Sequence, residues 1–103
     1  MKTTFTNAFE NGDFAKKISM SANYELKADE KGLFLAFSCS AASKTLTLGL
    51  EDGDQMIVTN IGGTNAVTVK NVAGDTGTSV AAGKSVLVVG SPTADASSVI
   101  ALN

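Results

Sequence analysis

Apolar and polar residues alternate with a period of two over most of the chain from Gly32 onward, and turn residues interrupt the alternation at short intervals. This period is typical of β-strands, whose successive side chains point to opposite faces of a sheet. Leu46, Leu48 and Leu50, for example, are separated by Thr47 and Gly49, which places three leucines on one face of a half-buried strand. The pattern predicts strands over residues 33–40, 45–50, 55–61, 66–72, 79–81, 85–89 and 99–102.

Glycine-containing turns separate these strands. Asp52-Gly53 stands between two strand patterns and predicts a hairpin with a type I′ turn, in which both central residues need positive φ. Residues 62–65 predict a second turn. Many short strands with glycine turns are typical of an all-β fold, and we expect an antiparallel β-sandwich or a small, jelly-roll-like barrel with an N-terminal arm.

The first 31 residues differ from the rest of the chain. They contain ten of its eighteen charged residues and four of its six aromatic residues, without a sustained period. Disordered tails are poor in aromatic residues, and burying one Phe contributes roughly 1.5 to 3 kcal/mol, so these rings are expected to find a surface. We therefore predict an arm over residues 1–31, with at most one short helical turn, ahead of a β domain over residues 32–103. Its expected docking residues are Phe5, Phe9, Phe14 and Ile18.

Two C-terminal strands are apolar on both faces, over residues 85–89 and 99–102. A strand of this kind fits between the core and a neighbouring subunit, and a chain of 103 residues builds only a modest core by itself. We expect self-association through Val86, Val88 and Ile100.

The charge and residue usage exclude several classes of function. The chain has eight Lys and no Arg against ten Asp and Glu, a formal net charge of −2, so it has no basic stripe for nucleic acid. It has no His, the usual general base at neutral pH. Its single cysteine, Cys39, excludes an intrachain disulfide and a multi-cysteine metal site, and is expected in the core.

Two short motifs have chemical interpretations that we set aside. Gly83-Lys84-Ser85 matches the end of a phosphate-binding P-loop, but Thr78 stands where the first glycine is required and a strand follows instead of a helix. We expect a turn there, with Gly83 at positive φ and Lys84 in solvent. The acidic run 51–54 is expected to be a solvated hairpin tip rather than a calcium site.

The sequence therefore predicts no catalytic residue, no cofactor and no metal site. Its longest apolar run covers only residues 33–37, too short for a membrane span or a signal peptide, which favours a soluble, unsecreted protein.

Residues 63–72, 74–84 and 85–89, with the final apolar strand, carry a resemblance. Over about residues 44–103 the chain resembles the small β modules of tailed-bacteriophage virion proteins, which include head fibre proteins, capsid decoration proteins and some tail-fibre domains. The resemblance implies a small, commonly trimeric, non-enzymatic protein that binds the outside of an assembled capsid through an N-terminal segment. The implied partners are the major capsid protein, or another virion protein, and two further copies in a homotrimer, without nucleic acid or membrane. The implied location is the capsid surface of the virion, after synthesis in the bacterial host cytoplasm.

Two other functions are compatible with the pattern. One is a tail-fibre or baseplate module that recognises a glycan or protein on the host surface. The other is a cellular carbohydrate-binding or adhesin module. The chain has no Trp and a single Tyr, Tyr24, whereas sugar sites usually stack the sugar on such rings.

Overall fold

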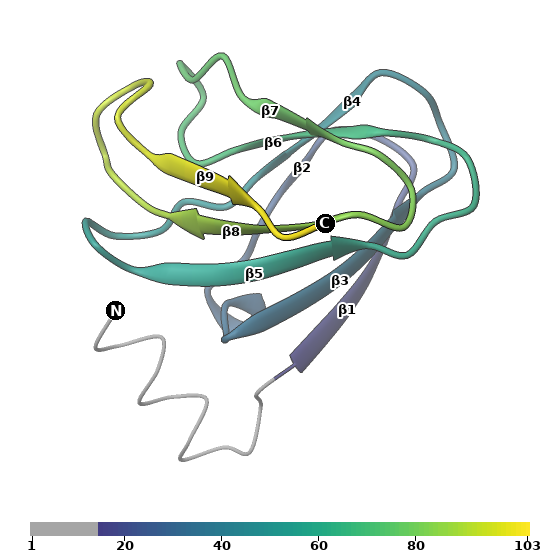
Figure 1. Cartoon of the computed structure of the whole chain (residues 1–103), viewed down its shortest axis with the longest axis horizontal. Coiled ribbons are helices and arrows are strands. Elements are labelled where there is room, and N and C mark those ends of the chain that lie inside the picture. The colour runs from purple at the N-terminus through teal and green to yellow at the C-terminus, as the bar shows by residue number, and fades with distance from the viewer. Residues whose placement is uncertain (1–14) are drawn as a thin grey trace.

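A computed structural model describes residues 15–103, which form two β-sheets packed face to face (Figure 1). The elements are β1 Ala15–Met20, β2 Tyr24–Glu25, the 3-10 helix η1 Ala28–Glu30, β3 Phe34–Cys39, β4 Lys44–Thr47, β5 Gln55–Asn60, β6 Val67–Lys70, β7 Thr78–Val80, β8 Ser85–Val89 and β9 Ser98–Ala101. The described part of the chain contains no helix that is long and apolar enough to cross a lipid bilayer.

The chain winds between the sheets instead of completing one before the other. Sheet A has the order β1-β3-β5-β8-β9 and sheet B the order β2-β4-β6-β7 (Figure 1). Up to β6, each strand is followed by one in the opposite sheet, and each new strand lies parallel to the previous one in its own sheet. Residues 15–70 therefore form three turns of a coil, after which β7, β8 and β9 pair antiparallel to their neighbours.

The all-β prediction is confirmed, but the antiparallel arrangement holds for only three of the strand pairs in the described residues, and the other four are parallel. The predicted hairpin at Asp52-Gly53 is wrong, because this turn leads from β4 in sheet B to β5 in sheet A. Gly53 has a positive φ of 76° but Asp52 does not, so the turn is not type I′. A tight turn fixes a local change of direction, and it does not decide which sheet receives the next strand.

The core lies between the sheets and follows the predicted alternation. In β3 and β5, every second residue is buried. Leu46, Leu48 and Leu50 are all buried, as expected from their spacing, and so is Cys39. The buried apolar cluster consists of Ile18, Met20, Leu26, Leu35, Phe37, Cys39, Leu46, Leu48, Leu50, Met56, Val58, Val67, Val69, Val80, Val86 and Val88.

The structure moves the N-terminal boundary of the β domain. Residues 15–31, expected in the arm, form β1, β2 and η1, and β1 pairs with β3 along its whole length. Ile18, predicted as a docking residue, lies in the core in a strand and not in a helical turn. The sequence signal was weak because Ile18 and Met20 are the only core positions in a short segment that also carries two lysines. Phe5, Phe9 and Phe14 lie outside the described residues.

Candidate functional site

The outer face of sheet A carries a continuous line of apolar side chains. Strand pairing places one residue of each strand beside the next across the sheet, in the order Ala15, Phe34, Ile57, Leu87 and Ile100. We call these five residues the apolar row. The side chains of Phe34 and Ile100 are 46% and 50% exposed, and those of Ile57 and Leu87 are half-buried. A shallow groove of about 140 Å³ on this face is lined by Leu33, Phe34, Gln55, Met56, Ile57 and Leu87.

The outer face of sheet B has the opposite character. Thr45, Thr68 and Ser79 stand side by side across β4, β6 and β7. Glu25, Thr47 and Lys70 form the neighbouring line across β2, β4 and β6. Threonine and charged residues are typical of a sheet face in contact with water. Of the two outer faces, that of sheet A is therefore the one suited to an apolar contact.

The structure separates the three residues expected to mediate self-association. Val86 and Val88 are 4% and 1% exposed and belong to the core of their own subunit, so they are not available to a neighbour. Ile100 is on the surface, in the apolar row. The available apolar side chains of β8 are those of the other face, Leu87 and Val89, which are half-buried.

Sequence analysis missed Phe34, Ile57 and Leu87 as surface residues. The signal was present, because residues 33–37, 56–58 and 86–89 are uninterrupted apolar runs instead of alternating ones. A run of this kind means that both faces of the strand are apolar, but it does not say which face is turned inward.

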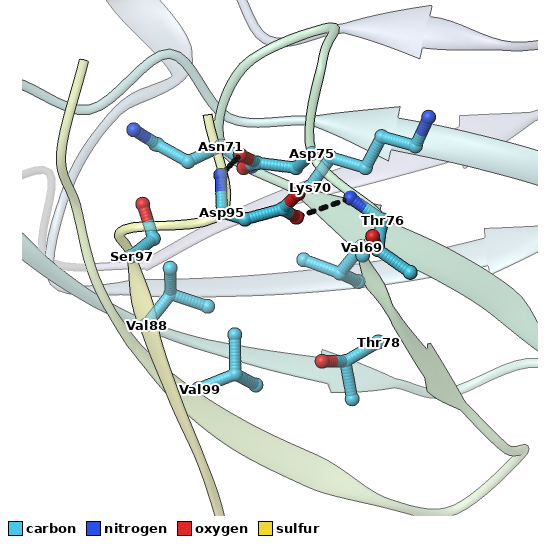
Figure 2. A pocket seen from close by; sticks show the side chains of 11 residues that line it. Val69, Lys70, Asn71, Asp75, Thr76, Thr78, Val88, Asp95, Ser97 and Val99 are labelled. Atoms are coloured by element: carbon cyan, nitrogen blue, oxygen red, sulfur yellow. Dashed lines mark hydrogen bonds between the residues drawn. The ribbon is translucent and has the colours of Figure 1, made fainter. Parts of the chain in front are cut away.

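A second candidate is a pocket of about 130 Å³ between the loop after β6 and the loop that joins β8 to β9. Figure 2 shows Asn71, Asp75 and Asp95 close together at one end of the pocket, and Val88 and Val99 at the other end with Thr78. Val69, Val88 and Val99 form the apolar part. Asp75 and Asp95 lie among the polar groups, one from each loop.

The two aspartates tie the loops together through backbone hydrogen bonds. Asp75 is buried, and its Oδ2 accepts hydrogen bonds from the backbone N–H of Asn71 at 2.9 Å and of Val72 at 3.0 Å. Asp75 Oδ1 accepts from the backbone N–H of Asp95 at 2.6 Å, and Asp95 Oδ1 accepts from that of Thr76 at 2.6 Å (Figure 2). We call this arrangement the aspartate latch.

The latch keeps Asp75 ionised. Burial by itself raises the pKa of this carboxyl group, but the hydrogen bonds from Asp95, Val72 and Asn71, together with the charge of Lys70, lower the pKa below its ordinary value. A general acid at neutral pH needs the opposite shift. The arrangement therefore suits a structural role, holding two loops in place, better than acid–base chemistry.

Tyr24, expected in the arm, lies in β2 and packs against the core. Its hydroxyl donates a 2.6 Å hydrogen bond to Glu30 Oε2, and this bond raises the pKa of Tyr24. Burial raises the pKa of Glu30, but the hydrogen bonds from Tyr24 and from the backbone N–H of Lys27 outweigh it and lower the pKa. The pair thus fixes η1 beside β2.

The two short motifs have structural roles. Gly83 has a φ of 82°, Lys84 is exposed and Ser85 begins β8, so the predicted turn is confirmed. The predicted solvated tip at residues 51–54 is wrong in one respect, since Asp54 is only 2% exposed. Within residues 15–103, no group of three or more His, Cys, Asp or Glu side chains is placed to hold a metal ion.

Comparisons with known proteins give no match that assigns a role to these residues. No protein-family model matches the chain, and no curated protein or solved structure is significantly similar to it.

Proposed function

We propose that this chain is a non-enzymatic virion structural protein that binds the outside of a bacteriophage capsid. In this role it is a decoration or head fibre protein, made in the bacterial host cytoplasm, that stabilises the shell or presents its β domain on the surface. Its partner is the major capsid protein or another virion protein, and it acts as a homotrimer.

The observation that carries the proposal is the position of the phenylalanines. Three of the five precede Ala15, whereas the buried cluster of the described domain contains only one, Phe37. Phe5, Phe9 and Phe14 need an apolar surface, and grooves between capsid subunits offer one in many identical copies. Several weak contacts from one oligomer then add up to stable attachment.

Cosedimentation with purified, assembled shells tests the proposal. The triple variant Phe5→Ser/Phe9→Ser/Phe14→Ser should bind at least about tenfold more weakly, because even one buried ring contributes more than the 1.4 kcal/mol that corresponds to a factor of ten. A deletion that extends beyond residue 14 is less suitable, since it also removes β1 from sheet A.

The matched control is Thr3→Ala/Thr4→Ala/Thr6→Ala, which changes the same segment and keeps all three rings. The control should bind like the unchanged protein. Equal binding by the phenylalanine variant would refute the docking role.

A second candidate is a tail-fibre or baseplate module that binds a host-surface glycan. It is favoured by a hollow of about 400 Å³ on sheet B, lined by Asn23, Tyr24, Glu25, Thr45, Thr47, Lys70 and Ala73. An aromatic ring with hydrogen-bonding neighbours is the chemistry that binds a sugar. A specific signal on a glycan array that disappears in Tyr24→Ala would favour this candidate over capsid decoration.

A further inference from the structure

We propose that the outer face of sheet A is the surface through which copies of this chain pack against one another, with the apolar row at the centre of the contact. This inference rests on the proposed function, in which the chain forms a homotrimer, and it names the surface through which the three subunits contact one another. The occupant of the face is a second copy of the chain.

The large exposed apolar side chains lie on sheet A or directly after its strands. The large exposed apolar residues of the described chain are Phe34, Ile61, Ile100 and Leu102. Phe34 and Ile100 belong to the apolar row, and Ile61 and Leu102 directly follow β5 and β9 of the same sheet. Scattered exposed residues are normal in a monomer, but a contiguous patch on one face marks a contact surface.

Most of the outer face of sheet A is uncharged. The strands β3, β5, β8 and β9 contain no charged residue. Apart from Lys17 at the β1 edge, this face therefore offers no charged group to a basic or acidic partner. Two copies can approach through β3, β5, β8 and β9 without like-charge repulsion, although each chain carries a formal net charge of −2. A second copy presents the same apolar row on the same uncharged strands.

The edge strands of the two sheets differ in how well they are protected against pairing with another chain. β1, at one edge of sheet A, carries Lys16 and Lys17, and the edge strands of sheet B are only two and three residues long. Charges and short length both protect an edge against pairing with another chain. The four residues of β9 contain no charge and no proline, and Ile100 of the apolar row is one of them. The least protected edge thus adjoins the apolar face.

The test is the oligomeric state of the full-length chain, measured by light scattering after gel filtration over a range of concentrations. The unchanged protein should have three times the mass of one chain. Ile100→Lys places a charge in the contact and should raise the dissociation constant about 100-fold or more, since a desolvated or repelled charge costs several kcal/mol.

Ser79→Lys is the matched control, because it places the same charge on an exposed position of β7, the edge strand of sheet B. It should leave the mass unchanged. Circular dichroism and urea unfolding check that Ile100→Lys is folded. Leu87→Thr, which places a polar residue of high β-propensity on the outer face of β8, is the second variant and should weaken association without disturbing the core.

Three outcomes would overturn the inference. These are a monomeric mass for the unchanged protein at every concentration, an unchanged mass for both variants of sheet A, or loss of association in Ser79→Lys as well. If the chain is monomeric and Ile100→Lys loses shell binding, the face belongs to the capsid protein instead. A failure of the proposed function gives a different result, a trimer with no affinity for shells.

Discussion

At the scale of single residues, buried polar side chains fix the places where the chain leaves a strand. Asn71 follows β6 and is 2% exposed. Its Nδ2 donates to the carbonyl oxygens of Leu50 at 3.1 Å and Ser91 at 2.8 Å, and its Oδ1 accepts from the backbone N–H of Leu50 at 2.7 Å. The side chain of Asn71 thus joins three of the loops that connect strands. Each hydrogen-bonding partner left unsatisfied in the interior would lower the free energy of unfolding by about 1 to 3 kcal/mol.

Asn60, at the end of β5, has the same role at another turn. It is fully buried, donates to the carbonyl oxygens of Asn65 and Val80, and accepts from the backbone N–H of Gly62. Sequence analysis interpreted these asparagines as part of ordinary strands and turns, because their partners lie up to 21 residues away. Partners at that distance depend on how the strands pack.

The aspartate latch gives a prediction for pH dependence. Asp75→Asn places an amide NH₂ against backbone N–H donors, and should destabilise the protein by about 2 kcal/mol at neutral pH. The folded-state pKa of Asp75 is lowered, so its stabilising effect is present above the unfolded pKa of about 4 and is lost as the pH falls through the folded value. Urea unfolding at a series of pH values should show the difference between the two proteins shrinking below about pH 4.

Asp52→Asn is the control, since Asp52 lies on an exposed turn. It should change the unfolding free energy by less than about 0.5 kcal/mol at neutral pH. A gap between Asp75→Asn and the unchanged protein that stayed constant down to pH 2 would contradict the latch.

At the scale of elements, the strands were more predictable than their partners. All strands from β3 onward were expected within a few residues of their observed bounds, because each is a short alternating or apolar segment bounded by turn residues. β1 and β2 were missed, since β1 carries two lysines and only two buried positions, and β2 has only two residues. The pairing of strands was also missed, because the turn at residues 51–54 has the local chemistry of a hairpin and leads to the opposite sheet.

The place of β1 in the domain can be tested with one substitution. Ile18→Ala removes a buried side chain between the sheets, and should lower the free energy of unfolding by about 2 to 4 kcal/mol. Ser19→Ala, at the exposed neighbouring position of the same strand, should change it by less than about 0.5 kcal/mol. Chemical denaturation measures both, and an equal, small effect of the two variants would place β1 outside the cooperative unit.

At the scale of the whole molecule, the winding of the chain makes neighbours of distant segments. In sheet A, Phe34 pairs with Ala15 and with Ile57, which are 19 and 23 residues away along the chain. In sheet B, Leu46 pairs with Tyr24 and with Val69, 22 and 23 residues away. Each turn of the coil therefore depends on the one before it, and the inner strands are held from both sides.

This arrangement predicts how the backbone amides exchange with solvent. In sheet B, the amides of β4 and β6 should exchange on the order of 100-fold more slowly than those of the edge strands β2 and β7, because edges open without unfolding the domain. Hydrogen exchange followed by NMR measures the individual rates. Uniform rates across the four strands would mean that the sheet opens only as a whole.

The sequence by itself determined that the chain is rich in β-strands, where most of them lie and which residues of the alternating strands are buried. These properties follow from side-chain alternation, which is local. Only the tertiary structure decided that the strands wind between two sheets, that Ile18, Val86 and Val88 belong to the core, and that Phe34, Ile57, Leu87 and Ile100 meet in one row. The physical reason is that an apolar strand can turn either face inward, and the choice is made by the strands that pack beside and opposite it.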